Sequence, residues 1–313
     1  MTFFPHDAGT TATTLAPAVD WEESDCLLCG QREWSPLVEA QDAEAQGTGL
    51  WFAVVQCQKC GLCFPNPRPT FPSIGSFYPA TYGPHQQRRA LADQGRGRTH
   101  VRQKDSRLFA GRTGRLLDFG CGSGRFLQRM HRRGWLVLGL DPSPNAVEFI
   151  CKQLHLPALQ GTLPHPDLRA GSFDLITMWH ALEHVHSPLQ ILREAHRLLA
   201  PGGRIHVAVP NIDSLPFRWF GSTWYGLDVP RHLTHFAPWT LHLMLERAGF
   251  QVGPIRMVPH TKWLRSSAEI ACAKINHPPG WQRWLKKRPF ASLATQYCSL
   301  LHQCDCMMVT AER

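Results

Sequence analysis

The sequence predicts an α/β fold in which helices cover both faces of a doubly wound, mostly parallel sheet of seven strands. From residue 115 onward, short apolar runs alternate with stretches of helical periodicity, the pattern of parallel strands joined by helical crossovers. Gly134, Gly202 and Gly249 each follow one of the helical stretches, and glycine commonly ends a helix. Residues 115–313 are therefore expected to form one domain.

The elements of this domain follow from the same alternation. The expected strands are 115–119, 135–140, 157–160, 173–179, 203–209, 251–258 and 305–311. The expected helices are 123–133, 143–155, 188–200 and 238–248. Two insertions, 210–237 and 259–303, interrupt the pattern after strand ends, where open α/β sheets usually bind ligands.

Three smaller units precede the domain. Residues 1–20 are rich in Thr, Ala and Pro without periodicity, which is typical of a flexible tail. Residues 21–82 contain two cysteine pairs and the stiff segment FPNPRP, and they are expected to form a small module. Residues 83–114 are interpreted as a linker that leads into an N-terminal helix.

Composition predicts a globular cytoplasmic protein. Apolar residues make up 43% of the 313 residues, with 11 Trp and 16 Phe, enough for a large core and too many for a disordered chain. The N-terminus lacks a basic region followed by an apolar stretch, and no apolar run is long enough for a spanning helix. Eleven cysteines without such a signal favour a reducing compartment.

The formal charge of +9 comes from two basic stretches. Residues 88–115 hold nine basic residues against two acidic ones, and residues 262–288 hold seven against one. Such stretches attract phosphates, nucleic acid or an anionic membrane face, and they also occur as ordinary solvated surfaces. Charge alone leaves these alternatives open.

A glycine-rich turn lies at the end of the first expected strand of the domain. In LLDFGCGSGRFL, residues 116–127, the dinucleotide spacing G-x-G-x-x-G fails, and the remaining pattern is D-x-G-x-G-x-G beginning at Asp118. The second strand, WLVLGLD, ends in Asp141. An acid at that position suits a pair of ribose hydroxyls, and a carboxylate at Asp118 suits a cationic amine.

These two motifs resemble those of the seven-stranded (class I) S-adenosylmethionine-dependent methyltransferases, over roughly residues 105–313. The resemblance implies a Rossmann-like methyltransferase domain with S-adenosylmethionine as its cofactor. It assigns the methionine moiety to Gly120, Gly122, Gly124 and the carboxylate of Asp118. It assigns the ribose and adenine to Asp141, Pro142, Ser143, Thr162 and Leu163.

The segment SFDLITMWHALEHV, residues 172–185, matches the fourth strand of that family and the loop after it. The resemblance places Trp179 and His180 where the methyl group is presented, and it gives Glu183 and His184 a structural or cofactor-side role. The loop lacks the [DNS]-P-P-[YFW] tetrad with which base-amino methyltransferases bind an exocyclic amine. Methylation of a nucleobase amine is therefore not favoured.

The paired cysteines predict a structural zinc site. Cys26, Cys29, Cys57 and Cys60 form two C-x-x-C pairs, each followed by a glycine, and four thiolates complete a closed tetrahedral zinc site. The head of the chain, down to CGL-x-F-x-NPRP, resembles the zinc-binding segment of carbohydrate and natural-product methyltransferases, including sugar C-methyltransferases. The chain differs from the C-methyltransferases in ending soon after the seventh strand.

Three histidines are candidates for the group that accepts a proton during methyl transfer to a hydroxyl, because histidine titrates near neutral pH. His232 is the first candidate and His235 the second, both in DVPRHLTHF, with His180 the third. The alternative is that the close pair orders the insertion through hydrogen bonds to backbone. Arg231 is expected to hold an acidic group of the acceptor.

The resulting prediction is a small-molecule methyltransferase that acts on a hydroxyl of a sugar, glycan precursor or secondary metabolite. Alternatives are an rRNA methyltransferase that binds RNA with the zinc module and the basic stretch, a sugar C-methyltransferase, and a cofactor-binding partner without catalysis. The aromatic and basic segment 259–303 is expected to cover the acceptor pocket or to form a homodimer surface, with a membrane surface as the alternative.

Overall fold

The structure is a computed structural model that describes residues 19–42, 49–78 and 113–313. The expected tail 1–20 and the linker with its N-terminal helix, 83–114, lie outside the described residues except for their last two positions. The basic stretch 88–115 does so as well, except for its last three positions.

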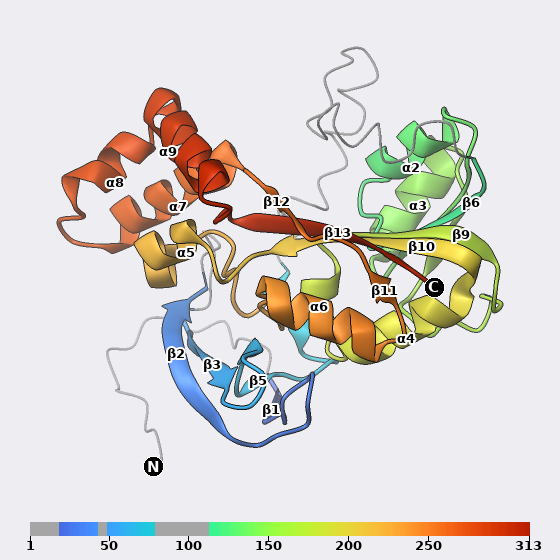
Figure 1. Cartoon of the computed structure of the whole chain (residues 1–313), viewed down its shortest axis with the longest axis horizontal. Helices are drawn as coiled ribbons and strands as arrows, with labels where there is room; N and C mark the ends of the chain where they lie inside the picture. Colours follow the sequence, from blue (N-terminus) through green and yellow to red (C-terminus); the bar gives the residue numbers. More distant parts are fainter. Residues whose placement is uncertain (1–18, 43–48, 79–112) are drawn as a thin grey trace, which may run out of the picture.

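A mostly parallel central sheet confirms the predicted fold class (Figure 1). Its order is β11-β13-β10-β9-β6-β7-β8, and β12 also pairs with β13. Strands β6 to β10 are mutually parallel, and β13 runs antiparallel to β10. The bounds are β6 (Arg115–Phe119), β7 (Leu136–Asp141), β8 (Ala158–Gln160), β9 (Phe173–Trp179), β10 (Leu199–Pro210), β11 (Gln251–Val252), β12 (Arg256–Val258) and β13 (Cys306–Glu312).

Within residues 113–313 the sheet has eight strands where seven were predicted, because the expected strand 251–258 is split into β11 and β12. Both short strands pair antiparallel with β13. Between them lies Gly253-Pro254-Ile255, and Pro254 has no N–H to donate to a ladder. The strand is thus interrupted, although both of its parts pair with the same neighbour in the same direction.

Helices cover both faces of the sheet (Figure 1). Helices α2 (Arg125–His131) and α3 (Pro144–Gln153) share a core with β6 and β7 that includes Leu127 and Ile150. Helices α4 (Pro188–Leu198) and α6 (Pro238–Arg247) pack on the other face with Leu192 and Leu241. Proline in the first turn of α3, α4 and α6 favours the start of each helix, since its missing N–H is not needed there.

The two insertions form a helical lobe beside one end of the sheet (Figure 1). The first contains α5 (Leu215–Phe220) and the 3-10 turn η5 (Gly221–Thr223), and the second contains α7 (Thr261–Lys274), α8 (Gly280–Leu285) and α9 (Arg288–Leu300). Phe220, Leu264 and Ala291 lie in their shared core. The described part of the chain contains no helix that is both long and apolar enough to span a membrane.

The N-terminal module packs directly on the domain. It has a three-stranded antiparallel sheet, β2 (Trp34–Gln41), β3 (Trp51–Cys57) and β4 (Cys63–Pro65). Strands β1 (Trp21–Glu22) and β5 (Arg68–Pro69) form a second small sheet, and the 3-10 turn η1 is Ile74–Phe77. Leu62 and Phe64 of the module share a core with Phe236 and Leu241 of the domain.

Candidate active site

The glycine-rich turn between β6 and α2 forms a tight backbone loop at the carboxyl end of β6. Gly120, Gly122 and Gly124 all have positive φ angles, of 73°, 49° and 69°, which glycine adopts without steric cost. A Cβ added at Gly120 would lie 2.6 Å from the Cβ of Ala181. The loop that follows β9 therefore lies directly against this turn, as expected of two neighbouring parallel strands.

Asp118 is a buried carboxylate at the centre of this arrangement. It is 2% exposed, and it accepts a hydrogen bond of 2.6 Å from the Thr177 hydroxyl. Burial raises the pKa of Asp118 to about 7, against a lowering by the Thr177 hydrogen bond. A carboxylate in this environment gains most from a nearby cation, which fits the ammonium group of S-adenosylmethionine.

Asp141 lies beside the glycine-rich turn and holds it in place through hydrogen bonds. Its two carboxylate oxygens accept hydrogen bonds from the backbone N–H of Gly122 at 2.8 Å and of Ser143 at 2.9 Å. Each oxygen keeps a second lone pair that can accept from a ribose hydroxyl. The expected ribose ligand therefore also holds the glycine loop in position.

The residues expected around the adenine lie near Asp141. Ser143 caps α3 by accepting from the Ala146 N–H, and Pro142 precedes it. The chain after β8 returns to Asp141, whose carbonyl accepts from the N–H of Gly161 at 3.0 Å. Thr162, which is half-buried, and Leu163, which is buried, follow immediately.

Trp179 ends β9 beside the start of α2. Its ring lies 5.2 Å from the ring of Phe126 and 4.8 Å from that of His206. The indole is half-buried against these two rings, next to the glycine turn that precedes Phe126. This position adjoins the expected methionine side of the cofactor site.

His180 and Glu183 form a pair at the carboxyl end of β9, in the loop that leads into η4 (Leu182–His184). The Nδ1 atom of His180 lies 3.3 Å from Oε1 of Glu183, and the His180 side chain is 35% exposed. His180 has a φ of 51°, and strained backbone of this kind concentrates at functional sites. Trp263 of α7 lies 5.1 Å away, ring to ring, so the helical lobe reaches this pair.

Three further histidines surround Glu183. His184 and His232 lie edge to face, with ring centroids 4.6 Å apart, and His232 and His235 are 6.2 Å apart. Burial lowers the pKa of His184 to about 4 and that of His235 to about 3. Burial alone would raise the pKa of Glu183, but the hydrogen bond from His180 and the nearby imidazoles hold it below its ordinary value. The structure thus brings His180, His232 and His235 into one cluster.

Arg231 does not face an acceptor, and the expectation that it would is wrong. The guanidinium is fully buried and forms ion pairs of 2.6 Å with Asp42 and 2.7 Å with Asp228. It also donates to the carbonyl of Phe77 at 3.0 Å. Arg231 therefore joins the N-terminal module to the insertion, and sequence reasoning had no signal for Asp42 because it lies 189 residues away.

The four paired cysteines meet as predicted. The Sγ atoms of Cys26 and Cys60 are 3.4 Å apart and those of Cys29 and Cys57 are 3.5 Å apart, near the separation of about 3.8 Å for two sulfurs on one zinc ion. Burial raises the pKa of the Cys26 thiol to about 11, so a thiolate there at neutral pH would need a bound cation. Cys63 lies outside this quartet.

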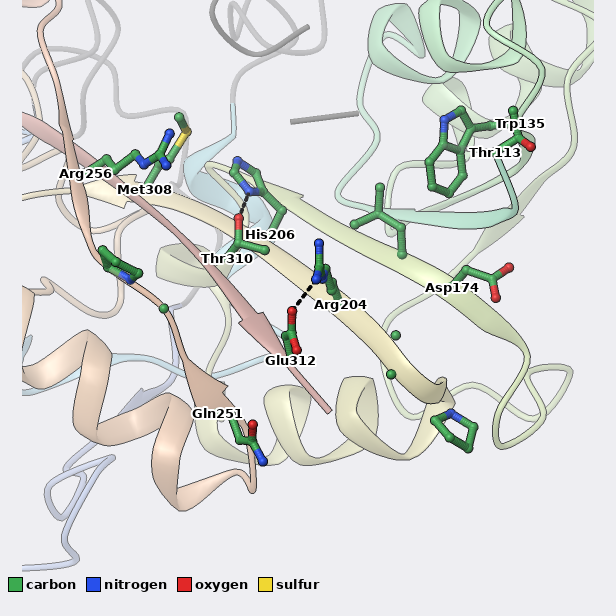
Figure 2. Close-up of a pocket in the computed structure, with 16 residues that line it drawn as sticks. Thr113, Trp135, Asp174, Arg204, His206, Gln251, Arg256, Met308, Thr310 and Glu312 are labelled. Carbon is green, nitrogen blue, oxygen red and sulfur yellow. Dashed lines mark hydrogen bonds and ion pairs between the residues drawn. The ribbon is translucent and has the colours of Figure 1, made fainter. Parts of the chain in front are cut away.

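A cavity lined by other residues is shown in Figure 2. It has a volume of about 710 Å³ and is lined mainly by β10, β11 and β13, with Arg204 paired to Glu312 and His206 bonded to Thr310 at 2.9 Å. It extends to Thr113 and Asp174, at the amino ends of β6 and β9. Open α/β sheets bind ligands at the opposite, carboxyl ends of their strands, so this cavity is not the predicted site.

The sheet order, the glycine turn after the first parallel strand and the acid at the end of the second define an S-adenosylmethionine-dependent methyltransferase, with a Rossmann-like fold and an N-terminal cysteine cluster. Residues 86–253, more than half of the chain, match the family model described as a methyltransferase domain. The chain belongs to this methyltransferase domain family, and it is an enzyme.

Curated relatives agree with this class. The chain is 28% identical over 179 residues to a ubiquinone biosynthesis O-methyltransferase of Xanthomonas oryzae pv. oryzae, a match that covers 52% of this chain and 73% of the relative. A ubiquinone biosynthesis O-methyltransferase of Vibrio parahaemolyticus is 32% identical over 120 residues, covering 36% and 49%. A solved complex of the Haloferax volcanii Trm112 methyltransferase activator with a methyltransferase aligns with a TM-score of 0.50 and 18% identity, covering 72% of this chain and 93% of that one, and it shows the fold alone.

Proposed function

We propose that this enzyme transfers the methyl group of S-adenosylmethionine to a hydroxyl of a small molecule, of the sugar, glycan-precursor or secondary-metabolite class. The observation that carries the proposal is the Glu183–His180 pair beside the glycine turn. Ala181 contacts the position of Gly120, so His180 is the neighbour of a residue that lies on the cofactor turn. From this position His180 can accept a proton from an acceptor hydroxyl that lies next to the methyl group of S-adenosylmethionine.

The cofactor is held by residues of four strand ends in this proposal, those of β6, β7, β8 and β9. Gly120, Gly122 and Gly124 leave room for the methionine moiety, and Asp118 pairs with its ammonium group. Asp141 accepts the ribose hydroxyls, and the adenine lies against Pro142, Ser143, Thr162 and Leu163, with Trp179 on the methyl side. When bound, S-adenosylmethionine supplies an electrophilic methyl group on a positively charged sulfur.

The histidine cluster supplies the proton acceptor. With Nδ1–H donated to Glu183, the acceptor lone pair of His180 lies on Nε2, where the Cys306 thiol makes a long contact of 3.9 Å that an acceptor hydroxyl would replace, and the His180 side chain is the most exposed of the three candidates. The acceptor oxygen bonds to the methyl carbon in line with the breaking carbon–sulfur bond, and its proton passes to His180. We assign His232 and His235, both buried, to ordering the acceptor side of the site.

Two observations support a hydroxyl of a small molecule as the acceptor. The relatives with the matched region are named as O-methyltransferases of ubiquinone biosynthesis, which modify an oxygen. The ring of Trp263 lies 5.1 Å from that of His180 and 5.6 Å from that of Tyr225, so aromatic side chains of the helical lobe lie beside the proposed base and suit a compact organic acceptor. The lobe is thus proposed as the cover of the acceptor pocket.

The N-terminal module is proposed to bind one structural zinc ion through Cys26, Cys29, Cys57 and Cys60. Four thiolates leave no open coordination position, so the ion would stabilise the module without taking part in methyl transfer. The module in turn contacts the histidine cluster, since Tyr78 bonds to His184 at 3.0 Å and the Cys63 carbonyl accepts from the His235 N–H at 2.8 Å.

The test is a methyl-transfer assay with methyl-labelled S-adenosylmethionine and three separate acceptor pools: cellular small molecules, purified rRNA and polysaccharide-free protein. We expect label in the small-molecule pool and none in rRNA. Label that enters rRNA, with retention on RNA that weakens as salt rises, would replace this proposal with the RNA alternative. Tight cofactor binding without turnover on any pool would favour a non-catalytic partner.

A further inference from the structure

A second cluster of metal-ligating side chains lies inside the histidine cluster, separate from the cysteines. Glu183, His184 and His232 each offer one ligand atom, and these atoms lie within 4.8 Å of one another. An ion with bonds of about 2.1 Å links atoms up to about 4.2 Å apart, so small side-chain rotations would close the group around an ion.

Glu183 brings to this cluster a buried side chain with an unsatisfied oxygen. Its side chain is fully buried, and Oε1 is engaged by His180. Oε2 has no hydrogen-bond partner within the part of the chain that the structure describes. Leaving a buried carboxylate oxygen without a partner costs several times more free energy of folding than losing a hydrogen bond between neutral groups. This unsatisfied oxygen is therefore the main indication of a bound cation.

Both imidazoles are oriented as metal ligands usually are. Nδ1 of His184 lies 3.0 Å from the Arg231 carbonyl, and Nδ1 of His232 lies 2.9 Å from the Gly226 carbonyl. The Tyr78 hydroxyl lies 3.0 Å from the same His184 nitrogen. A carbonyl accepts only from N–H, so the tautomer that satisfies both carbonyls has its proton on Nδ1 in each ring, with Tyr78 as a second acceptor at His184, and it leaves the Nε2 lone pairs for a cation. This outer hydrogen bond fixes the tautomer and the ring plane at most histidine metal sites.

The backbone holds the two sides of the cluster together. The carbonyl of Glu183 accepts from the N–H of Leu233 at 2.7 Å and of Thr234 at 3.1 Å, which places His232 against His184. Oδ2 of Asp228 lies 3.8 Å from Nε2 of His232, so a second carboxylate is within reach. The site is therefore built from two segments that the fold itself joins.

We propose that Glu183, His184 and His232 bind one divalent transition-metal ion. Two imidazoles and one carboxylate suit zinc, iron(II) or cobalt(II), and three protein ligands leave coordination positions open. In the reaction, which rests on the proposed function, an open position would take the acceptor oxygen while Glu183 connects the ion to His180. The ion would then orient the hydroxyl that His180 deprotonates.

The experiment counts metal ions in the whole enzyme. Protein with the cysteine site filled by zinc is treated with a mild chelator and titrated with Co²⁺, measured by calorimetry and visible absorption. We expect one further equivalent of Co²⁺ in the wild type, without the thiolate charge-transfer absorption that cobalt at the cysteines would give. Glu183→Gln and His232→Ala should each weaken this binding by about tenfold or more.

The matched control is His242→Ala, which removes an imidazole from an exposed histidine–glutamate pair on α6, 3.2 Å from Glu246. It should bind Co²⁺ as the wild type does. Thermal unfolding of each variant reports whether it is folded. If a variant is not folded, the number of Co²⁺ ions bound by the wild type still decides whether the second metal site exists.

No second equivalent in the wild type, or unchanged binding in both variants, would overturn the metal site. Full methyl transfer by enzyme with no ion at this position would overturn the ion's part in the reaction and would leave the proposed function standing. Failure to bind S-adenosylmethionine would contradict the proposed function and would say nothing against the second equivalent of metal.

Discussion

At the scale of single residues, Asp118 links cofactor binding to pH. Its pKa of about 7 means that the carboxyl group is largely protonated in the free enzyme below neutral pH. In the proposed site the ammonium group of the cofactor pairs with the charged form of Asp118, so cofactor binding should release a proton in this range. A raised pKa also means that Asp118 favours the folded state of the free enzyme at acid pH, and that this contribution is lost as pH rises through about 7.

We therefore expect the affinity for S-adenosylmethionine to rise between about pH 5.5 and 7, by up to about tenfold per pH unit. The rise should level off below about pH 8, where the amino group of S-adenosylmethionine loses its proton. Calorimetry in buffers of different ionisation enthalpy would show the released proton. Asp118→Asn should bind more weakly at neutral pH and should lose the slope. A variant that keeps the wild-type slope would mean that another group titrates.

Gly120 tests the close approach of the β9 loop to the glycine turn. Gly120→Ala places a Cβ 2.6 Å from that of Ala181 at a φ of 73°, so we expect cofactor affinity to fall at least tenfold and unfolding to become easier by about 2 kcal/mol or more. The control is Gly171→Ala, with a similar φ of 67° and no atom within 4 Å of the added Cβ. It should lose about 1 kcal/mol of stability and bind the cofactor normally.

His180 is best replaced by asparagine, because asparagine tolerates its positive φ of 51°. His180→Asn should bind S-adenosylmethionine normally and turn over about 10²-fold more slowly or worse, since it lacks the proton acceptor. His155→Asn changes an exposed histidine with a φ of 52° and should behave as the wild type in single-turnover assays. Normal turnover of His180→Asn, with losses in His232→Asn or His235→Asn, would move the base to the insertion.

The tight glycine turn after β6 could be located from the sequence because its residues are contiguous and their spacing is specific, and its role in cofactor binding stays a prediction. Thr177, Tyr78 and Asp42 could not, since each reaches its partner from a distant part of the chain. The histidines were found from their chemistry alone. Their burial and their contacts with one another depend on the packing of two loops, which no local pattern encodes.

At the scale of elements, strands and helices of the domain lie close to the predicted ranges, because periodicity and glycine or proline boundaries were strong there. The exception is 251–258, where apolar residues continue through Pro254 and conceal the break between β11 and β12. The three helices of the second insertion could be expected only as a helical segment, since their packing on α5 and η5 is long-range.

The two C-x-x-C pairs of the N-terminal module give a prediction about metal content and stability. Cys60→Ser should remove one zinc ion per chain and lower the melting temperature, since small metal modules depend on the ion to fold. Turnover should fall, because the module contacts His184 and His235 of the histidine cluster. The affinity for S-adenosylmethionine should stay within about twofold of the wild type, because the glycine turn lies at β6 and β7, away from these contacts. Elemental analysis and calorimetry measure both. An unchanged metal content would remove the zinc assignment.

At the scale of the whole molecule, the N-terminal module and the domain meet at a buried ion pair. Arg231 forms ion pairs with Asp42 of the module and Asp228 of the insertion. No sequence pattern indicated that these two segments, which are far apart along the chain, meet at one arginine. Asp42→Asn leaves part of a buried positive charge uncompensated and should cost about 3 kcal/mol of unfolding free energy. Asp213→Asn, in a surface pair with Arg218, should cost under about 1 kcal/mol in the same urea titration.

A similarly small loss in both variants would mean that Asp228 alone balances Arg231, and that the module is not anchored through Asp42. A loss confined to Asp42→Asn, with slower turnover, would show that docking of the module also positions the histidine cluster.

Methyl transfer to an oxygen, at the edge of the sheet where the glycine turn meets the loop of His180, can be tested by identifying the atom that carries the transferred methyl group. The enzyme is incubated with S-adenosylmethionine labelled with ¹³C in its methyl group and with the small-molecule pool, and the product is examined by two-dimensional NMR. We predict a methyl signal with the shift of a methyl ether, strongly reduced with His180→Asn. A methyl signal on carbon or nitrogen, or one that does not depend on His180, would contradict the account.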